Sequence, residues 1–164
     1  MKRFLLISVP VLALGLAGPA FAQSSDSIIN QIGSGNTATV TQTGTGGNTN
    51  TSQIDQIDNG TAIVTQGGTG ATNDSVITQT GDGSSATVSQ GGTNSTDNVS
   101  TIVQDGDNTA SVTQGGDGAT NTSDVSQSGG TLNSATVDQS GTSVINTSTI
   151  LQSGNSNTAS VTQN

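Results

Sequence analysis

The chain has 164 residues and a formal net charge of −9, and its only two basic residues, Lys2 and Arg3, lie at the N-terminus. From Gln23 onward the sequence contains eleven Asp but no Lys, Arg, His, Glu, Cys, Met, Pro, Phe, Tyr or Trp. This composition excludes nucleic-acid binding, which needs cations for phosphates and rings for bases, and cysteine-based metal sites. It also lacks most side chains that act as acids, bases or nucleophiles, so we expect no enzyme, no metal, no cofactor and no small-molecule substrate.

Residues 1–22 have the pattern of a secretory signal peptide. Lys2 and Arg3 precede an apolar run over residues 4–16, and the small residues Ala20 and Ala22 flank Phe21 before the predicted cleavage site. The run is shorter than the roughly 20 apolar residues that span a membrane, which disfavours an anchor. We therefore expect Sec export, cleavage after Ala22 and an extracellular protein.

Glutamine recurs at two positions in each of six units. The units are residues 25–42, 50–66, 73–90, 98–114, 121–139 and 146–163, which leave no room for a second domain. The mid-unit glutamines are Gln31, Gln56, Gln79, Gln104, Gln127 and Gln152, and the closing glutamines are Gln42, Gln66, Gln90, Gln114, Gln139 and Gln163.

Apolar residues precede each glutamine in steps of two. A period of two places these side chains on one face of a β-strand, so each unit is predicted to be strand, turn, strand. Residues four before the mid-unit glutamines are all Ser, and those six before are Asn in every unit but the first. The predicted apolar core consists of Ile29, Ile54, Ile77, Ile102, Val125, Ile150, Ala38, Val40, Ala62, Val64, Ala86, Val88, Ala110, Val112, Ala135, Val137, Ala159 and Val161.

A two-strand unit cannot bury its apolar face alone, so the units must stack with like residues over like. The sequence therefore predicts an all-β fold, a two-sheet β-solenoid of six repeats that stacks further into cross-β amyloid. Stacked glutamine amides can bond from coil to coil in ladders, as in cross-β assemblies. Because the core contains no aromatic residue, we expect the free monomer to be largely disordered and to order on an existing stack.

The repeats resemble those of the curlin family. Ser25, Gln31, Gly33, Asn36, Ala38 and Gln42 match every defining position of the curlin repeat, and the sixth unit matches at all but its first. Three features depart from the family: Ser27 and its equivalents replace an apolar residue, only Gln23 and Ser24 lie between the predicted signal peptide and the first unit, and the aromatic residues common in curlins are missing.

The resemblance implies a subunit of curli-like fibres, the extracellular amyloid that serves adhesion and biofilm matrix. It implies a homopolymer, a nucleating minor curlin and an outer-membrane export pore as partners. It also implies that the glutamines drive self-assembly, together with an asparagine ladder of Asn36, Asn108, Asn133 and Asn157.

Two further interpretations concern the outer positions. Thr or Ser occupies nearly every second position along the second strands, as in Thr37, Thr39 and Thr41. This array resembles that of ice-binding solenoids and suggests ice binding as the alternative function. Asp58, Asp82, Asp105, Asp107 and Asp117 are expected in turns or links. There they either approach one another in the stack and oppose premature pairing, or simply keep the chain soluble.

Overall fold

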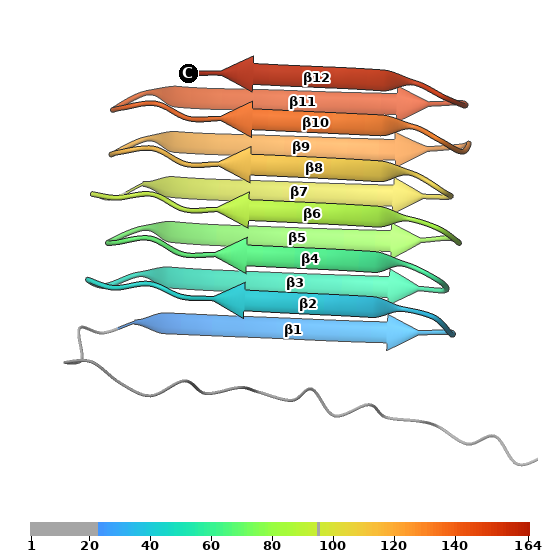
Figure 1. The fold of residues 1–164 in the computed structure, drawn as a ribbon, viewed down its shortest axis with the longest axis horizontal. Coiled ribbons are helices and arrows are strands. Elements are labelled where there is room, and N and C mark those ends of the chain that lie inside the picture. The colour runs from blue at the N-terminus through green and yellow to red at the C-terminus, as the bar shows by residue number, and fades with distance from the viewer. Residues whose placement is uncertain (1–22, 95) are drawn as a thin grey trace, which may run out of the picture.

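The computed structural model describes residues 23–94 and 96–164 as twelve β-strands in two parallel sheets (Figure 1). The predicted signal peptide lies outside the described residues. Within them no helix is long and apolar enough to cross a membrane. One sheet contains β1 Ser24–Ile32, β3 Thr49–Ile57, β5 Thr72–Thr80, β7 Asp97–Asp105, β9 Thr120–Ser128 and β11 Ile145–Ser153. The other contains β2 Thr37–Gln42, β4 Thr61–Gln66, β6 Ser85–Gln90, β8 Thr109–Gln114, β10 Ser134–Gln139 and β12 Thr158–Gln163.

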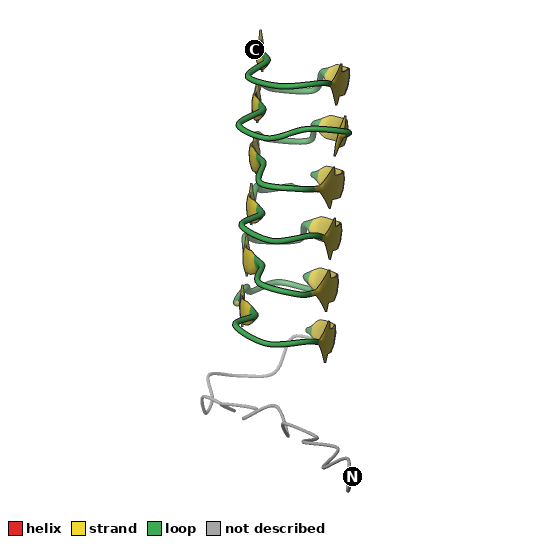
Figure 2. Ribbon diagram, turned by 90° about the vertical axis from the view of Figure 1, so that its right-hand side faces the viewer, coloured by secondary structure: helices red, strands yellow, loops and turns green. Residues whose placement is uncertain are grey.

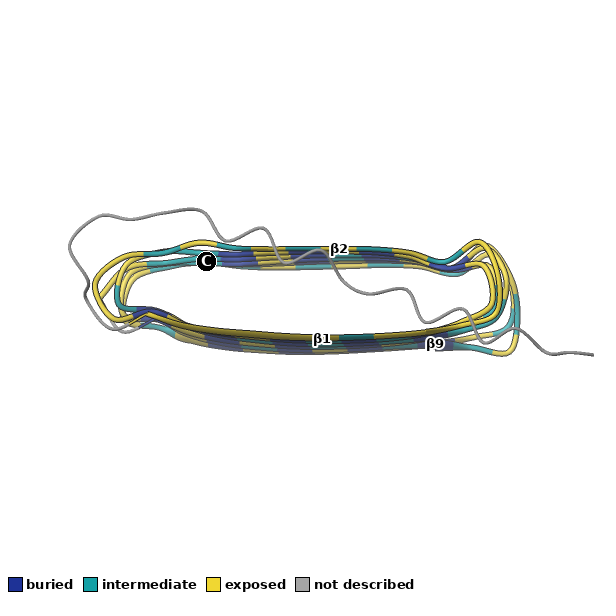
Figure 3. Cartoon of the chain, turned by 90° about the horizontal axis from the view of Figure 1, so that it is seen from below, coloured by how far each residue is buried: buried dark blue, intermediate teal, exposed yellow. Residues whose placement is uncertain are grey.

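Each pair of consecutive strands makes one coil, and six coils stack into a solenoid. Viewed along the stack, the coils superpose as one flattened loop (Figure 3), and viewed from the side the two sheets form separate columns (Figure 2). The predicted two-sheet β-solenoid of six strand-turn-strand repeats is therefore confirmed.

The register places like residues over like, because the side chains that face inward are nearly the same in every coil. Ile54 pairs with Ile29 below and Ile77 above, and Val64 pairs with Val40 and Val88 in the other sheet. A slip of one residue would turn the inward face outward, so the period of two fixes this register.

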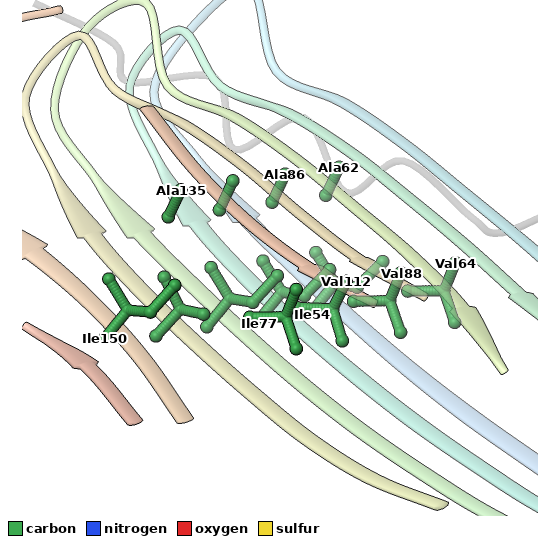
Figure 4. Close-up of a cluster of buried hydrophobic side chains, with 13 residues drawn as sticks. Ile54, Ala62, Val64, Ile77, Ala86, Val88, Val112, Ala135 and Ile150 are labelled. Atoms are coloured by element: carbon green, nitrogen blue, oxygen red, sulfur yellow. The ribbon is translucent and has the colours of Figure 1, made fainter. Parts of the chain in front are cut away.

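The apolar core is a narrow column between the sheets (Figure 4). It consists of an Ile or Val from each long strand and an Ala and a Val from each short one, so it is only two to three side chains wide. The predicted core residues of the interior coils are buried, whereas Ile29, Ala38, Val40, Ala159 and Val161 in the end coils are only partly buried. The ends of the stack are therefore where the core is incomplete.

The links between coils are also stacked, although their lengths differ. Isolated bridges run from Thr45 through Thr69, Thr93 and Asp117 to Thr142, so one residue of every link pairs with the next link. Glycine is required beside these bridges: a Cβ on Gly68, where φ is 130°, would overlap the carbonyl oxygen of Gly92 in the next coil.

Candidate functional site

The mid-unit glutamines form a continuous ladder inside the sheet of long strands. The side-chain Nε2 of each donates to Oε1 of the next, over 2.7–2.9 Å, from Gln31 at one end to Gln152 at the other. From Gln56 onward each Nε2 also donates to a backbone carbonyl at the start of a short strand, for example Thr61 O from Gln79. The amides thus bond the coils to one another and the two sheets together.

The closing glutamines form a second ladder in the sheet of short strands. It runs from Gln42 to Gln163 with spacings of 2.7–2.9 Å, and it has the same sense as the first, with Nε2 donating toward the C-terminal coil. Each amide also donates to a backbone carbonyl of a long strand, for example Thr51 O from Gln66. All the interior rungs of both ladders are buried and carry no charge.

A third ladder, of asparagines, was not identified from the sequence. Nδ2 of each residue donates to Oδ1 of the preceding one, over 2.8–2.9 Å, so this ladder runs in the opposite sense to the glutamines. The sequence signal was present, since an asparagine occurs six residues before each mid-unit glutamine from the second unit onward. The rungs are Asn50, Asn73, Asn98, Asn121 and Asn146.

The predicted asparagine ladder divides into a short run and one separate residue. Asn108, Asn133 and Asn157 are consecutive rungs with Nδ2 to Oδ1 distances of 2.9 Å. Asn36 is separated from them, because Gly60 and Ser84 occupy the equivalent positions of the next two coils. Its Oδ1 accepts from the backbone N of Gly60 instead, at 3.0 Å.

The N-terminal end of the stack presents unused acceptors. Gln31 is exposed, and among the described residues neither its Oε1 nor that of Gln42 accepts a hydrogen bond. Asn36 donates once from Nδ2, to Ile32 O, and so retains a second N–H.

The C-terminal end presents the complementary groups. Gln152 and Gln163 each donate once, to Ser134 O and Thr147 O, whereas interior glutamines donate twice. Each therefore keeps one N–H for a further coil. Asn157 completes the set, because its Oδ1 accepts no bond within the described part of the chain.

A column of serine hydroxyls lies between the asparagine ladder and the apolar core. The Oγ atoms of Ser52, Ser75, Ser100, Ser123 and Ser148 are buried without a hydrogen-bond partner among the described protein atoms. These are the positions where the family resemblance led us to expect an apolar side chain. The interior therefore contains buried hydroxyl groups that make no hydrogen bond to the described protein atoms.

The aspartates of the paired strands, and Asp117 in its link, have neutral neighbours in the stack. Asp117 pairs with Thr93 below and Thr142 above, and it accepts a hydrogen bond from Asn94 at 2.6 Å. In the paired strands, too, no Asp lies opposite an Asp of the adjacent coil. Within the chain the neighbours of Asp117 are thus Thr93 and Thr142, and Thr80 lies opposite Asp105. No group of three metal-ligating side chains occurs within residues 23–94 and 96–164.

The outer face of the short-strand sheet is an array of hydroxyls. Its three outward positions per strand are all Thr or Ser, except for Ile63 and Asp138. The ice-binding alternative stays a prediction, which a measurement of thermal hysteresis would test.

Comparison with known proteins identifies the repeat. Residues 130–164, which include β10, β11 and β12, match the family model described as Curlin associated repeat. No curated protein and no solved structure matches the chain. The match confirms the resemblance for this part of the sequence. Together, the repeat and the solenoid fold are those expected of a structural subunit and not of an enzyme.

Proposed function

Because residues 130–164 match the Curlin associated repeat, we propose that the whole chain is a curli-like fibre subunit that polymerises by adding copies of itself end to end. The observation that carries this proposal is the complementarity of the two end coils. Gln152 and Gln163 keep an unused N–H at one end, and Gln31 and Gln42 keep an unused acceptor at the other.

The end coils fit each other as adjacent coils of one chain do. If the stacking register continues, β11 of one copy pairs with β1 of the next, which sets Gln152 over Gln31 and Ile150 over Ile29. Likewise β12 pairs with β2, which sets Gln163 over Gln42 and Val161 over Val40. The partly buried core residues of both ends would then become covered, which adds the hydrophobic stabilisation that the free ends lack.

The sense of the ladders specifies how two copies meet. Contact between two N-terminal ends would bring together two surfaces whose glutamine ladders both present only acceptor oxygens, from Gln31 and Gln42. A buried acceptor without a partner costs about 1–3 kcal/mol. Head-to-tail addition instead pairs every ladder group with its complement, except at Asn146, which would face Ser25.

The biological setting follows from the same resemblance. The predicted signal peptide would export the chain, an outer-membrane pore would pass it to the cell surface, and a minor curlin would nucleate the fibre. The fibre would then serve adhesion and the biofilm matrix. Export requires an unfolded chain, which agrees with a monomer that orders only when it joins a stack.

Assembly of residues 23–164, which contain every contact described above, tests the proposal directly. The purified chain should convert from a soluble form to fibres that bind a cross-β-sensitive dye. Their diffraction should show reflections near 4.7 Å and about 10 Å, the strand and sheet spacings of cross-β structure. A chain that stays soluble and monomeric when seeded with its own sonicated material would contradict the proposal.

Variants of the terminal rungs test the mechanism. Gln163→Leu and Gln31→Leu each remove one hydrogen bond per junction, worth about 1 kcal/mol, and should raise the critical concentration for assembly about fivefold. Gln53→Leu is the matched control, because Gln53 carries the same amide but faces outward and bonds only to Asp55. Equal critical concentrations for the end variants and the control would show that the ladders do not direct assembly.

A further inference from the structure

Large apolar side chains lie on the outer face of the long-strand sheet at its two ends. Leu151 in β11 is 75% exposed, and Ile28 and Ile32 in β1 are 51% and 65% exposed. These strands are the last and the first of their sheet (Figure 1). Exposed aliphatic side chains are unfavourable in water unless a partner covers them.

Within the chain the neighbours of Leu151 are polar. The register places Ser126 opposite it on β9, with Asp124 and Ser128 at the diagonal positions. Ile28 likewise lies opposite Gln53, with Thr51 and Asp55 at the diagonals. Neither Leu151 nor Ile28 therefore has an apolar cross-strand partner within the chain, whereas Ile32 lies opposite Ile57.

The continued register supplies such partners across a junction between two copies. With Gln152 over Gln31, Leu151 lies opposite Asn30 of the next copy, and Ile28 and Ile32 of that copy occupy the diagonals. Diagonal positions are about 7–8 Å apart between backbones, which long side chains can bridge.

We propose that Leu151, Ile28 and Ile32 form an intermolecular aliphatic cluster, on the outside of the sheet, that exists only at the junction of two stacked copies. This inference rests on the proposed function and adds to it a second surface that recognises the partner. The interior ladders are nearly the same in every coil, so by themselves they do not distinguish the first coil of a partner from any other coil. The cluster makes this distinction, because Leu151 finds two apolar diagonal neighbours only above the first coil.

The test compares outward substitutions at and away from the junction. Leu151→Thr and Ile28→Thr in residues 23–164 should each raise the critical concentration about two- to fivefold, the effect of one cross-strand apolar pair. The double variant should be less impaired than the sum of the two, since both belong to one cluster. Leu151→Met, which keeps a flexible apolar side chain, should assemble like the unchanged chain.

Val103→Thr is the matched control, because Val103 occupies the same row of the sheet as Leu151 but lies in the fourth coil. If Leu151→Thr and Val103→Thr fibres have the same critical concentration, the cluster does not exist, although the assembly itself stands. A Leu151→Thr effect on the lateral bundling of fibres with no change in critical concentration would also overturn the inference. If the unchanged chain forms no fibres, the proposed function and this inference both fail.

Discussion

Single buried hydroxyls limit the stability of the solenoid. Five serine Oγ atoms lie in the interior without a partner among the described protein atoms, and each one adds a desolvation cost of about 1–3 kcal/mol. Such a cost opposes folding of an isolated chain more than an apolar residue would. Under the proposed assembly, the serines would favour a chain that remains unfolded until it joins a stack.

Replacing one of these serines should stabilise the fold. We expect Ser100→Ala to raise the urea midpoint of the β-sheet circular dichroism signal of the assembled fibres, by an amount equivalent to about 1 kcal/mol, because the buried hydroxyl is removed and the methyl group fits. Ser126→Ala, on the outer face of β9, is the control and should leave the midpoint unchanged. An unaltered or lower midpoint for Ser100→Ala would mean that the hydroxyl is satisfied in solution.

Gly68, in the link between the second and third coils, is constrained by the coil next to it. Gly68→Ala should destabilise the solenoid by about 1–3 kcal/mol, since φ is 130° there and the added methyl overlaps Gly92 O. Gly91→Ala provides the comparison, because its nearest heavy atom would be a comfortable 3.6 Å away. The urea midpoint of each variant reports its stability. Equal midpoints for Gly68→Ala and Gly91→Ala would contradict the stacking of the links.

Among the elements, the asparagine ladder makes the clearest prediction. Asn98→Ala removes a rung, leaving Asn73 Oδ1 without its donor and Asn121 Nδ2 with only its bond to Gly115 O. One buried acceptor and one buried N–H then lack partners, so the stability of the solenoid, measured by the urea midpoint of the fibres, should fall by about 2–4 kcal/mol. Asn30→Ala is the control, because its hydrogen bond to Asp55 is exposed. A loss no larger than that of the control would mean that water or backbone replaces the missing rung.

The strands and their register could be predicted from the sequence, whereas the course of the links could not. Period two and near-identical inward residues leave one alignment that buries Ile54 over Ile29, so the pairing follows from hydrophobic burial alone. The links vary in length and composition, and their bridges at Thr45 and Thr69 depend on glycine conformations that show no period. The glutamine positions were predictable for the same reason as the strands. The sense in which each amide points depends on carbonyls of the opposite sheet, which no local pattern specifies.

At the scale of the whole molecule, charge opposes assembly even though no two carboxylates pair directly in the strands. The chain from Gln23 onward carries eleven Asp and no basic residue, so each added copy brings eleven negative charges close to those already in the stack. Salt screens the repulsion between exposed charges that are farther apart than the Debye length, which is about 3 Å at 1 M salt and about 30 Å at 0.01 M. Salt should therefore accelerate growth.

Seeded elongation measured between 0.01 M and 1 M sodium chloride tests this effect. We expect the initial rate to rise severalfold over this range, and an uncharged solute at equal osmolality should not reproduce the increase. A rate independent of salt would show that the spacing of the aspartates already removes the repulsion.

The opposed sense of the glutamine and asparagine ladders has a consequence for the electrostatics of a long filament. Each row of amides is a row of aligned dipoles, and aligned dipoles add, as the peptide units of a helix do. Here the asparagine rows point against the glutamine rows. Their fields partly cancel, and the backbone of a β-sheet adds little of its own. A filament of the proposed kind would therefore build a smaller electric potential at its tips than one in which every amide row pointed the same way.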